Sequence, residues 1–193
     1  MPSAPRNAAL GFLSILEHEQ HGLFGGYLLL NLAGRPLEFH CTAPIKPNRA
    51  QQILYGPTLE AFLYGEQIGR TLVGSAKTEP LLICTDREPA MALRELVEMP
   101  IALILDSPLP GGPPATGGDD IAGKTYRQDA PHAHRPKLLT FDFGRNRLAV
   151  AERAESDRAL IIQRLGELTD AFDLAEPFVR IREAIEEAQQ AVR

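Results

Sequence analysis

The stretch "PLLICTDREPAMALRELVEMPIALILD", Pro80–Asp106, decides the fold because it reads as strand, helix, strand within a short span. Its two outer segments are apolar on both faces, as buried parallel strands are. The segment between them carries Pro89 in the first helical turn, where a missing N–H costs little. The stretch therefore predicts a βαβ unit with a right-handed crossover, and a chain of the α/β or α+β class.

The N-terminal third predicts an antiparallel meander at the start of the same mixed sheet. The runs LGFLSILEH, LFGGYLLLNLAG and LEFHCTA are separated by polar or glycine-containing reversals. Gly25 and Gly26 inside the second run indicate a bulge or a close backbone approach. Residues 48–75 then show helical spacing that Gly56 and Pro57 interrupt, which predicts two helices or one kinked helix.

The chain changes character after the second strand of the βαβ unit. Residues 107–136 are rich in glycine and proline and contain few large apolar side chains, so we expect a mobile insertion. Beyond it, KLLTFDFG and RLAVAERA predict a hairpin, and two amphipathic helices follow. The expected organisation is an α/β core over residues 1–106, the insertion, and residues 137–193 completing the same domain.

The composition is that of an ordinary soluble protein. Hydrophobic residues make up 44% and charged residues 23% of the chain, and the formal net charge is −5. This charge predicts no general nucleic-acid binding. Two cysteines without a spacing pattern indicate reduced thiols, and the apolar run AALGFLSIL is too short to span a bilayer. We therefore expect a cytoplasmic protein without a membrane partner.

Two aspartates follow the two predicted parallel strands. Asp86 comes after LLICT, and Asp106 comes after IALIL. Ligands of open α/β sheets bind at the carboxyl edge, and neighbouring strands lie about 4.8 Å apart, so the two carboxylates are placed to share a divalent cation. The structural alternative is that Asp86 caps the following helix and Asp106 starts a turn.

His40 and Cys41 are adjacent and raise the question of a nucleophile with its base. Side chains alternate along a strand, so Leu37, Phe39 and Cys41 share one face. We assign that apolar face to the core, which makes Cys41 a buried small hydrophobe and directs His40 away from it. Neighbours on a strand make a poor catalytic pair.

Two basic residues flank the start of the first predicted helix. Lys46 and Arg49 lie beside the helix N-terminus, where free N–H groups favour an anion. The sequence thus predicts an anion-binding site, with ordinary solvated charges as the alternative.

A histidine pair lies in the predicted insertion. His132 and His134 alternate, so both imidazoles fall on one side of an extended chain, and they are candidate metal ligands. Zinc needs three or four protein ligands, so this pair requires a remote acid. The sequence contains no phosphate-binding loop, dinucleotide fingerprint, nucleophile elbow or C-x-x-C pair, and no motif identifies a family.

The last predicted helix carries an apolar seam at coiled-coil spacing. Phe178, Ile181 and Ile185 recur three and four residues apart, and Ala188 and Val192 continue the seam. This spacing predicts a contact with a protein partner or with a second copy. The alternative is that the helix packs on its own domain.

These features together favour a binding or assembly module without a catalytic centre of its own. The alternative is a metal-assisted hydrolase that uses Asp86 and Asp106, with help from His40 or from the histidine pair at residues 132 and 134. No cofactor is expected for the module, whereas the hydrolase requires a divalent cation.

Overall fold

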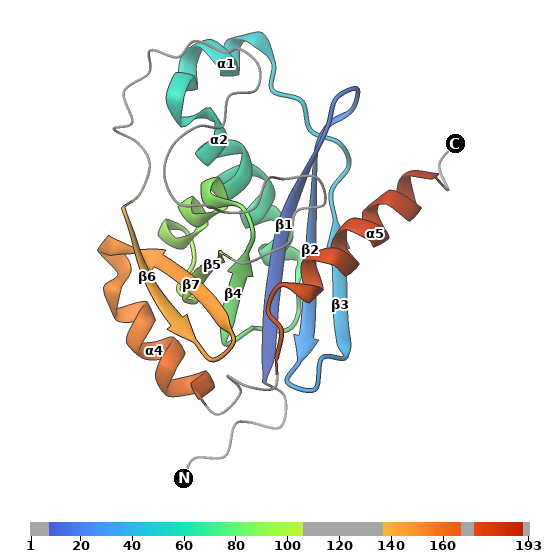
Figure 1. Ribbon diagram of the computed structural model, residues 1–193. Helices are drawn as coiled ribbons and strands as arrows, with labels where there is room; N and C mark the ends of the chain where they lie inside the picture. Colours follow the sequence, from blue (N-terminus) through green and yellow to red (C-terminus); the bar gives the residue numbers. More distant parts are fainter. Residues whose placement is uncertain (1–7, 106–136, 167–171, 191–193) are drawn as a thin grey trace.

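A computed structural model of the chain describes residues 8–105, 137–166 and 172–190. Its centre is a seven-stranded mixed sheet with the order β3-β2-β1-β4-β5-β7-β6 (Figure 1). The strands are β1 (Ala9–His18), β2 (Gly22–Asn31), β3 (Pro36–Cys41), β4 (Leu82–Thr85), β5 (Ile101–Ile104), β6 (Leu138–Phe143) and β7 (Asn146–Ala151). The predicted α/β class with an initial antiparallel meander is confirmed.

The meander and the βαβ unit meet at the middle of the sheet. Strands β1, β2 and β3 pair antiparallel, whereas β4 lies parallel to β1 on one side and to β5 on the other. The segment between β4 and β5 is a 3-10 helix, η3 (Glu88–Glu95), rather than the predicted α-helix. A 3-10 helix rises about 2.0 Å per residue instead of 1.5 Å, so this short connector spans more of the strand length.

One face of the sheet is covered by the helices that follow β3, together with η3. These helices are α1 (Arg49–Tyr55), η1 (Gly56–Thr58), α2 (Leu59–Ala61), the π-helical η2 (Phe62–Gly69) and α3 (Arg70–Ser75). The predicted interruption falls at Gly56, whose φ of 48° favours glycine, and Pro57 begins the next turn. Below this layer lies an apolar core that includes Leu13, Tyr27 and Ile68.

The opposite face is covered by η4 (Glu152–Ala154), α4 (Glu155–Leu165) and α5 (Glu176–Gln190). Helix α5 packs across β1 and β2, and α4 packs on β7 (Figure 1). The side chains of Phe178, Ile181 and Ile185 are 1%, 0% and 3% exposed in this core. The prediction that they form a contact with a partner or a second copy is therefore wrong, because the seam faces the chain's own sheet.

Adjacent glycines in β2 let both helical layers approach the sheet. A Cβ on Gly25 would overlap Ile68 of η2 and lie 2.8 Å from Leu72. A Cβ on Gly26 would overlap Ile181 of α5, on the other face. The pairing of β1 with β2 is regular at both glycines, so the predicted close approach is present and the predicted bulge is not.

Residues 107–136, the predicted insertion, lie outside the described part of the chain. Within the described ranges, no helix combines the length and the apolar character needed to cross a membrane.

Replacing Gly26 with alanine is expected to destabilise the protein, because the added methyl group overlaps the α5 side chains. Overpacking of this kind costs about 1–3 kcal/mol. Gly74 in α3 is the matched control, since nothing lies within 4 Å of a Cβ placed there. Gly74→Ala is expected to raise the free energy of unfolding by roughly 0.5–1 kcal/mol. Denaturant unfolding of both variants measures the difference, and an unchanged Gly26→Ala variant would contradict this account of the packing.

Candidate active site

A buried carboxylate lies at the carboxyl end of β4. Asp86 follows the strand directly, and its side chain is 0% exposed. In the parallel ladder Leu13 of β1 lies beside Thr85, so the next residues, Ser14 and Asp86, are neighbours. Side chains alternate along both strands, so both point to the face that α5 covers. The structure thus brings a hydroxyl and a carboxyl group together beneath α5.

The polar atoms of this pair are not satisfied by the described residues. Both carboxylate oxygens of Asp86 and the Oγ atom of Ser14 are buried without a hydrogen bond of regular geometry to a described residue, although the Ser14 hydroxyl is close enough to lower the pKa of Asp86. Buried polar groups are nearly always paired, and each exception calls for an explanation. Three orphaned oxygen atoms on neighbouring strands are a donor set suited to a hard cation such as Mg²⁺.

Burial raises the pKa of the Asp86 carboxyl group above its ordinary value. The positive charge of Arg87 first, then hydrogen bonding from Ser14 and from the backbone, and last the charge of Arg182 on α5 oppose this effect. Arg87 Nε lies 4.0 Å from Asp86 Oδ1, which is an ion pair without a hydrogen bond. Arg87 is thus the cation that lies next to the Asp86 carboxyl group at this end of the sheet.

A second polar contact lies near the end of β1, on the opposite face. The Tyr64 hydroxyl donates a hydrogen bond to Glu17 Oε1 at 2.5 Å. Burial first, and this hydrogen bond second, raise the pKa of Tyr64, whereas the charge of Arg87 lowers it. Sequence reasoning missed Ser14, Glu17 and Tyr64, because only the register of β1 against β4 and η2 shows which of its residues meet a partner.

The predicted partners of Asp86 are placed differently. Asp106 follows Leu105 directly in the sequence but lies outside the described residues, as do His132 and His134. Among the residues that the structure describes, no group of three or more histidine, cysteine, aspartate or glutamate side chains is arranged to hold a metal ion. Asp86 with Ser14 is therefore part of a donor set and not a complete one.

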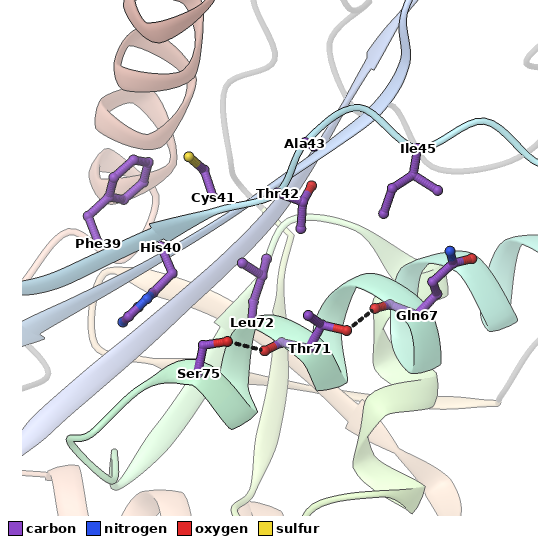
Figure 2. A pocket seen from close by; sticks show the side chains of 10 residues that line it. All are labelled: Phe39, His40, Cys41, Thr42, Ala43, Ile45, Gln67, Thr71, Leu72 and Ser75. Carbon is purple, nitrogen blue, oxygen red and sulfur yellow. Dashed lines mark hydrogen bonds between the residues drawn. The ribbon is translucent and has the colours of Figure 1, made fainter.

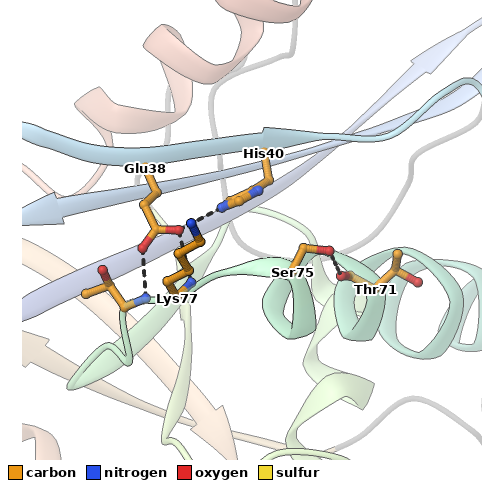
Figure 3. A network of polar contacts seen from close by, with 6 residues as sticks. Glu38, His40, Thr71, Ser75 and Lys77 are labelled. Carbon is orange, nitrogen blue, oxygen red and sulfur yellow. Dashed lines mark hydrogen bonds and ion pairs between the residues drawn. The ribbon is translucent and has the colours of Figure 1, made fainter.

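His40 does not belong to the Asp86 site. It lies on β3, which β2 and β1 separate from β4, and its side chain points to the α3 face rather than to the α5 face. Its Nε2 atom lies 2.9 Å from Glu38 Oε2 (Figure 3). The expected help from His40 in a metal-assisted reaction is wrong, because three strand spacings of about 4.8 Å lie between the two residues.

Glu38 fastens the edge strand to the chain that leaves α3. Its carboxylate accepts hydrogen bonds from the backbone N–H groups of Lys77 at 3.0 Å and Thr78 at 2.8 Å (Figure 3). Hydrogen bonding to Thr78 first, then to Lys77 and His40, lowers the pKa of Glu38 to about 2. His40 is thus a partner in a structural contact.

The predicted core face of β3 is exposed. Leu37 and Phe39 are 46% and 39% exposed, and Cys41 is exposed as well. The assignment of Cys41 to the core is wrong, because β3 is the outermost strand and α5 packs on β1 and β2 instead. Cys41 and His40 do point to opposite sides of the strand (Figure 2).

A hollow of about 540 Å³ runs along the outer edge of β3 (Figure 2). Phe39, His40 and Cys41 line it from the strand, and Thr71 and Ser75 line it from α3. The hydroxyl groups of Thr71 and Ser75 donate to backbone carbonyls of their own helix, at Gln67 and Thr71. These two hydroxyl groups are thus paired within the helix, whereas the Oε1 atom of Gln67, which also lines the hollow, is buried without a hydrogen-bond partner among the described residues.

The predicted anion site at Lys46 and Arg49 is described only in part. The side chain of Asn48 accepts a hydrogen bond from the N–H group of Gln51, and the Gln51 side chain accepts from the N–H group of Asn48. Lys46 donates to the carbonyl oxygen of Gln20 in the β1–β2 turn. The helix start is capped by its own residues, and anion binding there stays a prediction.

No protein-family model matches the chain, and no curated protein matches it in sequence. Its fold is similar to part of two crystal structures of Endonuclease V from Ciona intestinalis in complex with DNA that contains an inosine followed by a ribo-adenosine. The TM-scores are 0.33 and 0.35 at 11% and 10% identity. Each alignment covers 51% of this chain and 46% of the endonuclease chain, less than half of its length. A likeness of this size carries no argument about the chemistry of this chain.

Two expectations are corrected at this point. Both similar structures are of a nuclease with bound DNA, so the expected module without a catalytic centre and the expected absence of nucleic-acid binding are set aside. The second expectation rested on the net charge of −5, an average over the whole chain that says nothing about where cations gather. Arg87, which lies 4.0 Å from Asp86 Oδ1, is one such local cation.

The two thiols are expected to differ in reactivity. Cys41 is exposed, whereas Cys84 is buried in the core and burial raises the pKa of its thiol. Because the thiolate is the reactive form, dilute native protein should react rapidly with one equivalent of a thiol reagent and with the second only after denaturation. Cys41→Ser removes the fast reaction and Cys84→Ser leaves it. Rapid labelling of both thiols in the folded protein would contradict the described burial.

Proposed function

We propose that the protein is a divalent-cation-assisted hydrolase whose centre includes Asp86. The observation that carries the proposal is the carboxyl group itself, which is fully buried at the carboxyl end of a parallel strand and whose oxygens form no hydrogen bond of regular geometry with a described residue. A buried carboxyl group without a partner destabilises a fold. Carboxyl groups whose pKa is raised by burial are common in functional sites. A cation bound by Asp86 and Ser14 satisfies the orphaned oxygens.

The residues around Asp86 suit an anionic substrate. Arg87 follows it in the chain and Arg182 approaches from α5, and both bring positive charge to the carboxyl edge. Phosphate esters are the anionic substrates that arginine recognises with matching geometry. We therefore assign the substrate to the phosphate esters, with nucleic-acid phosphodiesters among them.

Each group then has a task in the reaction. A bound cation would supply charge stabilisation and lower the pKa of a water molecule. Asp86 would hold the cation, and the Ser14 hydroxyl would be a further oxygen donor from the neighbouring strand. Arg87 and Arg182 bind and orient the anionic ester, and α5 keeps bulk water from the carboxyl group.

The free cysteines of the chain are suited to a reducing compartment. Both described cysteines are free, so the fold does not depend on a disulfide. We therefore place the enzyme in the cytoplasm.

Replacing Asp86 with asparagine tests the proposal through activity. Hydrolysis of a nitrophenyl phosphodiester, and of DNA and RNA oligonucleotides, is measured with Mg²⁺ or Mn²⁺. Asp86→Asn is expected to lower the rate at least about tenfold, the lower end of the loss seen when even the partners of metal ligands are removed. Asp142→Asn is the control, because Asp142 lies exposed on β6. Wild-type protein without activity on any of these probes, or an active Asp86→Asn variant, would contradict the proposal.

The same variant separates a functional carboxyl group from a structural one. Burial raises the folded-state pKa of Asp86, so the unfolded chain loses its proton first and the stability contributed by this group falls as pH rises above about 4. Without added metal, Asp86→Asn should therefore melt at a higher temperature than wild type at pH 7 and at the same temperature near pH 3. Mg²⁺ should raise the melting temperature of wild type only. A variant that is less stable at pH 7 would show that Asp86 has a structural role.

A further inference from the structure

The hollow along the outer edge of β3 has the size of a small-molecule site. Its volume of about 540 Å³ falls within the roughly 300–1,000 Å³ that is usual for ligand pockets. Side chains of β3, of the segment that follows it, and of η2 and α3 line the hollow (Figure 2). None of these described side chains is a lysine, an arginine, an aspartate or a glutamate. Because a buried charge without a partner is costly, the hollow is suited to an uncharged ligand.

The helical wall of the hollow presents oxygen atoms that can accept hydrogen bonds. Gln67, Thr71 and Ser75 follow one another four residues apart, so they share one face of the continuous helix formed by η2 and α3. The Thr71 and Ser75 hydroxyl groups donate their protons to backbone carbonyls at 2.5 Å and 2.8 Å, and their oxygen atoms can still accept. Gln67 Oε1 is buried without a partner among the described residues. It belongs to a π-helical segment, a geometry that is frequent at functional sites.

The strand wall adds one acceptor and one donor. Hydrogen bonding, first of all to Thr78, lowers the pKa of Glu38 to about 2, so this carboxylate is ionised at neutral pH and can only accept. The Nε2 atom of His40, 2.9 Å away, therefore carries a proton, and Nδ1 of the neutral imidazole is an acceptor. Thr42 Oγ1 accepts from the N–H group of Gly25 at 2.9 Å, which leaves its own proton available. Acceptors thus outnumber donors around the hollow.

We propose that the hollow binds an uncharged, flat heterocycle that carries an amino group beside a ring nitrogen, the edge that adenine presents. The amino group supplies the N–H donors that match the acceptors of the two walls. The ring nitrogen accepts from the Thr42 hydroxyl group, and the apolar ring lies against Ile45 and Leu72, which also line the hollow. Strands β2 and β1 lie between β3 and β4, so this site is separate from that of Asp86.

The reactivity of Cys41 reports whether the hollow is occupied, because Cys41 lines it and is an exposed thiol. At about 1 mM, adenine is expected to slow the reaction of Cys41 with a thiol reagent at least twofold, which corresponds to a Kd of about 1 mM or below. The matched probe is 6-dimethylaminopurine, which has the same ring but no amino N–H, and it is expected to leave the rate unchanged. Equal slowing by both purines, or none by adenine, overturns the proposal.

Two threonine variants test the helical wall. Thr71→Val removes an acceptor and keeps the shape of the side chain, so it is expected to raise the Kd for adenine about two- to tenfold, as the loss of one hydrogen bond predicts. Thr58→Val is the matched control, because the Thr58 hydroxyl group also donates to a nearby backbone carbonyl, at 2.8 Å, and Thr58 does not line the hollow. Circular dichroism confirms that both variants are folded. Equal effects of the two substitutions overturn the assignment of this wall.

Gln67→Leu tests the buried amide oxygen separately from the hydroxyl groups. That oxygen has no partner among the described residues, and a buried unpaired polar group is itself destabilising. The substitution is therefore expected to leave the melting temperature unchanged or higher, and to remove the protection of Cys41 by adenine. A folded Gln67→Leu protein in which adenine protects Cys41 as it does in wild type overturns the role of this wall in binding.

Discussion

Helices pack against both faces of β2 at two successive residues, and the rest of the architecture depends on this close packing of helix against strand. Gly25 and Gly26 have no side chain to hold the layers apart, so Ile68 and Ile181 reach the sheet from opposite sides. A residue with a Cβ at either position would force one layer outward. Protein interiors are packed as densely as organic crystals and do not absorb such a shift without loss of contacts.

The position of α5 sets the chemistry at the carboxyl end of β4. Gly26 pairs with Ser14, and Ser14 is the neighbour of Asp86, so the helix that rests on the glycine also covers the hydroxyl and the carboxyl groups. Close packing thus removes water from Asp86 and raises the pKa of its carboxyl group. Arg182 belongs to the same helix, and its positive charge lowers the pKa of Asp86 in opposition to burial.

The sequence predicts elements more reliably than it predicts which face of an element is buried. The strands of the βαβ unit follow from apolar runs, and residues 82–85 and 101–104 form them as expected. Alternation also places Phe39 and Cys41 correctly on one face of β3, although the pairing with β2 shifts register at Leu37. It cannot decide whether a helix covers that face, because the answer depends on the distant residues that position α5. For the same reason the seam of α5 was assigned to a partner although it faces the chain's own sheet. Within the candidate site, the sequence locates Asp86 because it follows a strand. It does not locate Ser14, because only the register of β1 against β4 shows that the two residues are neighbours.

One geometric limit connects the buried acid with the exposed edge. A helix with its side chains is about 10 Å wide, and strands are spaced about 4.8 Å apart, so one helix covers two strands. Helix α5 lies over β1 and β2, where it encloses Ser14 beside Asp86. β3 is the third strand and falls outside its width, which leaves Phe39 uncovered. A helix moved outward to shield β3 would uncover β1 and admit water to Asp86.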